Sequence, residues 1–101
     1  MIDYNVEFTK GVLFVRFYGI LNSFTEKEVK DDIYEIIKEG GIRNLVINIE
    51  DVEKEDDIIL FDELNELIRE NDGRMIICGN KFLDFEYSSN ELSALKEFSV
   101  W

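Results

Sequence analysis

The sequence contains no histidine and no proline, and its single cysteine is Cys78. Without histidine, histidine-based catalysis and the common zinc sites are excluded. One cysteine cannot form an internal disulfide, and Cys78 follows the apolar residues Met75, Ile76 and Ile77. We therefore expect a buried thiol that packs as a small hydrophobic side chain.

Basic residues are also scarce, with 11 lysines and arginines against 23 acids and a formal net charge of −12. Such a charge repels nucleic acid and anionic lipid, so we expect neither as a partner and a basic protein surface as the natural complement. No apolar run approaches membrane-spanning length, and the N-terminus carries Asp3 and Glu7 where a signal peptide has its apolar core. The expected location is cytoplasmic.

The chain does have the material for a hydrophobic core. Its 101 residues are 46% hydrophobic and 13% aromatic, which predicts a single small domain over residues 1–101. Apolar and polar residues alternate over residues 2–8, as in an edge strand, whereas residues 12–18 are apolar on both faces and Gly19 ends that run. Further strands are expected at residues 44–49 and 74–78.

Helical patterns separate these strands, so the strands they connect should be parallel. Thr25 and Glu28 predict a capping box for a first helix that ends near Lys38, and Ser88 and Glu91 predict one for a short terminal helix. A last edge strand is expected from Phe82, Leu83, Phe85 and Tyr87. The predicted fold is α/β: a mixed, mainly parallel sheet in the order ββαβαβ with a short C-terminal unit, and helices packed on it.

An acidic segment follows the buried strand at residues 45–47. Between residues 50 and 57 it carries six carboxylates, and function usually sits where a loop leaves the carboxyl end of a parallel strand. The segment lacks the glycine and the alternate-position spacing of a calcium loop, so we expect a solvated loop with no metal or cofactor. Asp56 or Asp57 should cap the second helix, which is a commoner role than a catalytic acid–base pair.

Four consecutive apolar residues, Ile58 to Phe61, open that second helix. One face of a helix cannot bury all four side chains. Leu60 and Phe61 fit the core stripe that continues through residues 64, 67 and 68. Ile58 and Ile59 are therefore either covered by the C-terminal tail or exposed as a docking patch.

The order of elements, together with three stretches, resembles the STAS domain, and more closely the bacterial anti-sigma factor antagonists. The stretches are Gly-Val-Leu-Phe-Val-Arg at 11–16 with Gly-Ile-Leu-Asn at 19–22, Ile-Arg-Asn-Leu-Val-Ile-Asn-Ile-Glu-Asp-Val at 42–52, and Gly-Arg-Met-Ile-Ile-Cys-Gly at 73–79. The similarity spans residues 4–80. It implies a module that acts by binding an anti-sigma factor, typically a serine kinase, and not by catalysis.

Members of this family are switched by phosphorylation of a serine within Asp-Ser-Ser-Gly-Leu-Gly at the start of the second helix. The motif aspartate falls on Asp56 and the phosphoacceptor position on Asp57, and a second family aspartate falls on Asn22. The resemblance thus implies a partner-binding site of Asn22, Asp56, Asp57, Ile58 and Ile59, without ordinary serine phosphorylation. A phosphate would add about two negative charges there, whereas Asp57 supplies one permanently.

Two other functions remain open from the sequence. A sensor of small molecules or divalent metals would use Asp56, Asp57 and Asn80, which follow the carboxyl ends of parallel strands. A degenerate structural subunit of a larger regulatory assembly would use the fold without a site of its own.

Overall fold

The computed structural model describes residues 2–55, 58–80 and 85–98. The strands are β1 (Ile2–Thr9), β2 (Val12–Leu21), β3 (Asn44–Lys54), β4 (Arg74–Cys78) and β5 (Glu86–Ser88), and the helices are α1 (Thr25–Gly40), α2 (Leu60–Glu70) and α3 (Glu91–Glu97). No helix within these residues is long and apolar enough to cross a membrane.

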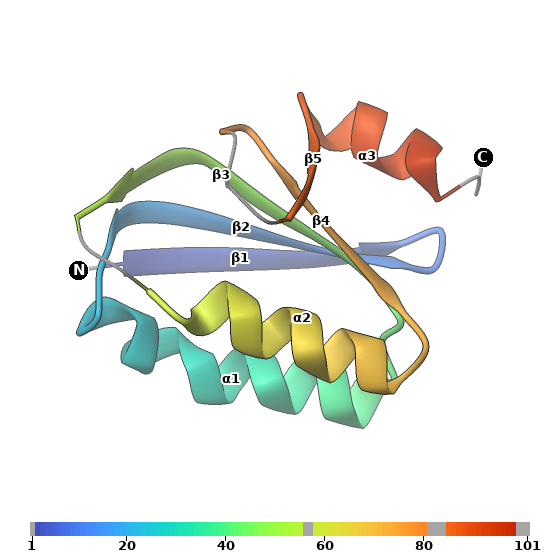
Figure 1. Cartoon of the computed structure of the whole chain (residues 1–101), viewed down its shortest axis with the longest axis horizontal. Coiled ribbons are helices and arrows are strands. Elements are labelled where there is room, and N and C mark those ends of the chain that lie inside the picture. Colours follow the sequence, from blue (N-terminus) through green and yellow to red (C-terminus); the bar gives the residue numbers. More distant parts are fainter. Residues whose placement is uncertain (1, 56–57, 81–84, 99–101) are drawn as a thin grey trace.

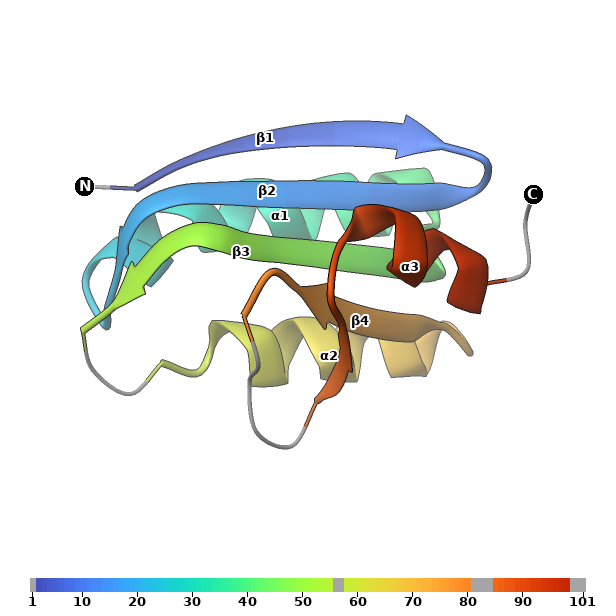
Figure 2. The ribbon, with the colours of Figure 1, turned by 90° about the horizontal axis from the view of Figure 1, so that it is seen from above.

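The strands form one mixed sheet whose spatial order, β1-β2-β3-β4-β5, is also their order in the chain. β1 pairs antiparallel with β2, and every later pair is parallel. Helices α1 and α2 cover one face of the sheet, and the short α3 lies on the other (Figures 1 and 2). The predicted α/β fold with a mainly parallel sheet is confirmed.

The larger hydrophobic core lies between the sheet and the two longer helices. Phe17, Leu45 and Ile47 from the sheet meet Ile33 of α1 and Phe61 of α2, and all five side chains are fully buried. A smaller cluster lies under α3. It consists of Val12, Phe14, Val46, Ile76, Cys78 and Ala94, with Leu95 and Phe98 packed against it. Cys78 is thus the buried thiol that the sequence predicts, and burial raises its pKa to about 12.

Two strands run further than predicted. β2 continues past Gly19, where φ is +110°, and β3 continues through the acidic residues to Lys54. The register shifts between Arg16 and Tyr18, and pairing then resumes up to Leu21 and Lys54. The expected loop at residues 50–54 is therefore wrong: the ladder satisfies the backbone while the acidic side chains stay in solvent.

Backbone crowding explains two glycines near the ends of β4. A Cβ at Gly73 would lie 2.0 Å from the carbonyl oxygen of Arg43, and one at Gly79, where φ is +98°, would lie 2.5 Å from the amide nitrogen of Glu50. No side chain fits at either position without a shift of backbone. These contacts fix how closely the loops flanking β4 approach β3.

The terminal helix does not use the predicted capping box. Asn90 is the N-cap of α3, and its side chain accepts a hydrogen bond from the Ser93 amide. The carboxylate of Glu91 turns toward the sheet instead. Of the residues predicted for the last strand, Tyr87 lies in β5, Phe85 precedes it, and Phe82 and Leu83 lie outside the described residues.

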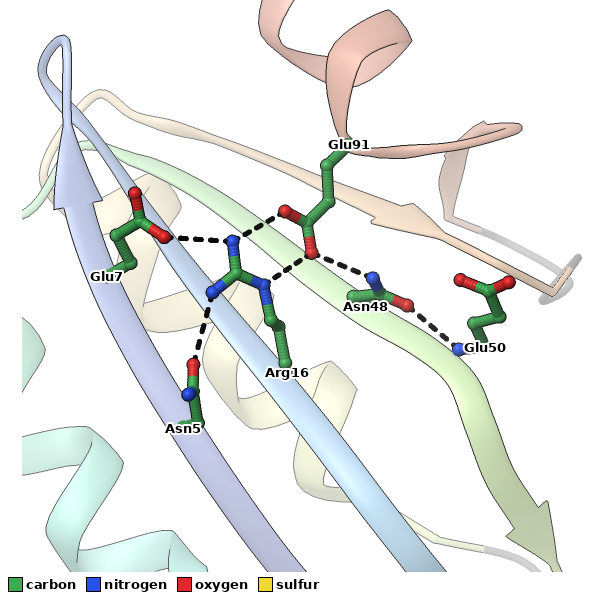
Figure 3. A network of polar contacts seen from close by, with 6 residues as sticks. All are labelled: Asn5, Glu7, Arg16, Asn48, Glu50 and Glu91. Atoms are coloured by element: carbon green, nitrogen blue, oxygen red, sulfur yellow. Dashed lines mark hydrogen bonds and ion pairs between the residues drawn. The ribbon is translucent and has the colours of Figure 1, made fainter.

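A polar network fastens α3 to the sheet (Figure 3). The Arg16 guanidinium donates two hydrogen bonds of 2.7 Å to Glu91, one of 3.0 Å to Glu7 and one of 3.1 Å to Asn5. Asn48 donates to the same Glu91 carboxylate at 2.8 Å. The hydrogen bonds from Arg16 outweigh the effect of burial and hold the pKa of Glu91 below its ordinary value. Charge-assisted hydrogen bonds and apolar packing therefore both hold α3 against the second face of the sheet.

Candidate functional site

The predicted site lies where the chain leaves the carboxyl ends of β2 and β3 and enters α1 and α2. Asn22 occupies the β2–α1 junction. Its Oδ1 accepts hydrogen bonds from the Phe24 and Thr25 amides, both at 2.9 Å, and its Nδ2 donates to Glu55 at 2.9 Å. The side chain thus joins the start of α1 to the end of β3.

This arrangement replaces the capping box predicted for α1. The N-cap residue is Phe24, whose phenyl ring has no oxygen to cap the helix; the Asn22 side chain instead accepts hydrogen bonds from the Phe24 and Thr25 amides. The Thr25 hydroxyl accepts from the Asn22 amide and donates to the carbonyl of Ile20. Glu28 is exposed. The junction is therefore a tight, fully hydrogen-bonded corner.

The segment between β3 and α2 is fastened to this corner on both sides. On the β3 side, the Glu55 amide donates to the Leu21 carbonyl at 3.0 Å. On the α2 side, the Ile59 amide donates to the carboxylate of Glu26, at 3.1 and 3.4 Å from its two oxygens. Glu26 lies in the first turn of α1 and is only 5% exposed.

Asp56 and Asp57, the predicted motif aspartate and phosphoacceptor position, lie outside the described residues. The helix that they were expected to cap begins at Leu60, with Ile59 as its N-cap residue and no side-chain cap there. The start of α2 is thus later than predicted. At this start of α2, the Ile59 amide donates to the carboxylate of Glu26 in the first turn of α1.

Ile58 and Ile59 have different environments. Ile58 is 8% exposed and belongs to the larger core, so of the two alternatives left open by the sequence, an exposed docking patch does not hold for this side chain. Ile59 is 61% exposed, and Phe24 at the start of α1 is 79% exposed. Both exposed side chains belong to N-cap residues, Phe24 of α1 and Ile59 of α2, at the end of the sheet where the predicted site lies.

A shallow cavity of about 230 Å³ lies between the first turns of α1 and α2. Its lining includes Ser23, which precedes Phe24, together with Glu26 and Ile59. Lys30 of α1 and Glu63 of α2 close it with an ion pair of 2.6 Å. The Oε1 of the Glu63 carboxylate is buried and has no hydrogen-bond partner among the described residues. The exposed side chain of Ile59 therefore stands beside a small, largely apolar depression.

Of the residues expected for a sensor, Asp56 and Asp57 lie outside the described residues, and Asn80 lies within them. The Asn80 side chain is occupied by a hydrogen bond of 3.0 Å to the carbonyl of Ile49. Among the described residues, no three acids or thiols lie close enough together to hold a metal ion.

Two residues of this site are not predictable from the sequence as site residues. Phe24 has no pattern that distinguishes it from other surface aromatics, although its place between a strand and a helix favours exposure. Glu26 carries no signal in the sequence at all, since its partner amide lies 33 residues away. Only the tertiary contact between the two helix starts gives it a role.

Comparison with known proteins gives a consistent result. The family model of the STAS domain matches residues 3–82. The fold superimposes on unphosphorylated SpoIIAA, an anti-sigma factor antagonist, with a TM-score of 0.76 and 14% identity, over 96% of this chain and 97% of that one. The phosphorylated form of SpoIIAA from Bacillus matches with a TM-score of 0.74 and 15% identity, over 95% and 99%. A protein from Thermotoga maritima described as an anti-sigma factor antagonist gives 0.82 and 11%, over 93% and 92%.

Proposed function

The chain belongs to the STAS domain family, and on that premise we propose that it is a regulatory binding module of the anti-sigma factor antagonist type. It binds an anti-sigma factor of the serine kinase class and so influences sigma-factor-dependent transcription. It acts by occupying its partner and not by catalysis. The anti-sigma factor antagonists among the structural relatives, at 11 to 14% identity, support an anti-sigma factor as the partner, and the serine kinase class is what the family resemblance implies.

The exposed side chain of Ile59 carries this proposal. It stands at the start of α2, in the stretch that corresponds to the family's phosphorylation motif, and it is 61% exposed although Ile58 beside it is buried. An isoleucine held in solvent loses the free energy that burial would give, about 1.5–3 kcal/mol. A partner that covers Ile59 and Phe24 recovers that free energy.

The charge of the surroundings defines the partner further. Glu55 and Asp62 on either side of Ile59 in the chain are exposed, and the whole chain carries −12. A basic rim around an apolar contact is the complementary surface. The stretch at residues 50–62 contains no serine, threonine or tyrosine, which supports a module that is not controlled by ordinary serine phosphorylation.

An affinity capture from cells of the source organism tests the proposal. Tagged wild-type chain is compared with Ile59→Ser and with Leu92→Ser, a matched control because Leu92 is 57% exposed and lies on α3, across the sheet. Wild type and Leu92→Ser should retain a kinase-like anti-sigma factor that Ile59→Ser loses. Equal capture by all three chains, or no anti-sigma factor with any of them, contradicts the proposal.

A calorimetric titration of the captured partner then addresses Asp57. We expect Asp57→Ser to weaken binding, mainly through a slower association rate, because the charge belongs to an adapted interface and one carboxylate imitates a doubly charged phosphate poorly. Binding of wild type should also weaken as salt rises. Tighter binding by Asp57→Ser would instead identify Asp57 as an imitation of the phosphorylated state.

A further inference from the structure

A buried carboxylate stands where the two helices of the candidate site begin. Glu26 is 5% exposed and lies in the first turn of α1. Charged side chains are rarely buried to this extent unless they are paired. The hydrogen bond that Glu26 accepts comes from the Ile59 amide, at the start of a different helix.

The contact corresponds to one of the two hydrogen bonds of a capping box, here made between two helices. In a capping box within one helix, a glutamate at the third helical position accepts from the N-cap amide. The third residue of α2 is Asp62, which is exposed, while the amide of the N-cap residue Ile59 donates to Glu26 of α1. The carboxylate thus supplies negative charge near the positive ends of both helices.

The other end of the segment is tied to the same corner. The Glu55 amide binds the Leu21 carbonyl, and the Glu55 carboxylate accepts from the Asn22 amide group. The hydrogen bonds at Glu55 and Ile59 therefore come just before the family's phosphorylation motif and within it, on either side of residues 56–58 in the chain. Both ties lead to the β2–α1 junction, more than 30 residues earlier in the chain.

We propose that Glu26 is a positioning residue for the recognition surface: its carboxylate fixes the start of α2 and so holds Ile59 in its exposed position. This inference rests on the proposed function for what Ile59 recognises, but the positioning itself is a property of the isolated chain. It also places a carboxylate of α1 at the start of α2.

Amide hydrogen exchange, followed residue by residue by NMR on the isolated protein, tests this. In Glu26→Ala, the Ile59 amide should exchange about 10-fold faster or more than in wild type, because it loses a hydrogen bond to a charged acceptor. The amide of Ile47, in the central strand, corrects for any change in global stability. Glu28→Ala is the matched control: it removes an exposed carboxylate from the same turn, and exchange at Ile59 should stay as in wild type.

Glu26→Gln separates positioning from a general loss of packing. Glutamine keeps the carbonyl acceptor and the length of the side chain, so it should restore most of the protection of Ile59. Exchange at Ile59 that rises in Glu26→Ala only as much as exchange at Ile47 overturns the proposal. So does a Gln variant that behaves like the Ala variant.

The capture experiment gives the second readout. If an anti-sigma factor is retained by the wild-type chain, Glu26→Ala should lower the affinity about 10-fold, and Glu26→Gln should bind nearly as well as wild type. Loss of protection without loss of affinity would show that Ile59 is positioned but not used. If no anti-sigma factor is captured, the proposed function fails, while the exchange data still decide whether Glu26 positions Ile59.

Discussion

Neutralising Glu91 should destabilise the domain by a definable amount. In Glu91→Gln, the two hydrogen bonds of 2.7 Å to Arg16 change from a bidentate ion pair to, at most, one good contact with the amide oxygen. Arg16 keeps Glu7 and Asn5, so the guanidinium is not left alone. The loss of stability is therefore smaller than the loss caused by leaving a buried charge without any partner.

Two limits bracket the magnitude. Breaking a fully buried ion pair costs about 3–5 kcal/mol, whereas an exposed pair contributes about 0–1 kcal/mol. The side chains of Arg16 and Glu91 are each 24% exposed, which places this pair between those limits. We expect the free energy of unfolding to fall by about 2 kcal/mol. For a domain of this size, the melting temperature should fall by about 8–16 °C.

The effect should depend on pH with a defined sign. Hydrogen bonds from Arg16 hold the pKa of Glu91 below its ordinary value in the folded chain. A carboxylate with a depressed pKa contributes stability that is present above the unfolded pKa, about 4.3, and is lost as the pH falls through the folded value. The stability difference between wild type and Glu91→Gln should thus be full near neutral pH and shrink in acid.

Urea unfolding followed by circular dichroism measures this, with Glu97→Gln as the matched control. Glu97 lies on the same helix and contacts Arg74 at 3.4 Å, but its side chain is 56% exposed. Its neutralisation should cost less than about 0.5 kcal/mol. The reasoning on the Arg16–Glu91 pair is refuted if Glu91→Gln lowers the free energy of unfolding by as little as Glu97→Gln. It is also refuted if the loss in Glu91→Gln stays constant from neutral pH to acid.

Three further outcomes are expected. Gly73→Ala should lower the free energy of unfolding by about 2 kcal/mol or more in urea titrations, because its Cβ would meet the carbonyl oxygen of Arg43; a neutral substitution contradicts this. The Cys78 thiol, whose pKa burial raises to about 12, should react with a disulfide reagent only on unfolding, and rapid labelling of folded protein would show otherwise. Incubation with ATP and the captured kinase should leave residues 50–62 unmodified in a mass spectrum, whereas phosphate on Ser23 would place a switch at the β2–α1 junction.

The sheet and its helices are predictable from the sequence because their signals are local. Alternation over residues 2–8 gives the edge strand, and the apolar stripe of α2 gives the face that packs on the sheet. The sequence does not predict that β3 extends to Lys54, and the reason is physical. Residues 50–54 are mostly acidic and carry no strand pattern of their own, but β2 beside them supplies the pairing partner.

The candidate site stays a prediction. Family resemblance leads to the start of α2, and the structure adds the contacts made there by Asn22 with Glu55 and by Ile59 with Glu26. Asn22 also holds the β2–α1 corner together, through its hydrogen bonds with the Phe24 and Thr25 amides. Contacts between residues more than 30 positions apart leave no periodicity in a sequence, which is why Glu26 was not identified from it.

The order of the strands has a consequence for how the domain forms. Each strand after β1 pairs with the strand synthesised immediately before it, so its pairing partner is already present in the growing chain. Because strands that are neighbours in the chain pair with each other, the loops that have to close are short, and short loops favour rapid folding. The second face of the sheet is the exception. Val12 and Phe14 are made early, but Ala94 and Leu95 are made only after all five strands, so an apolar surface stays open to other nascent chains until α3 has been made.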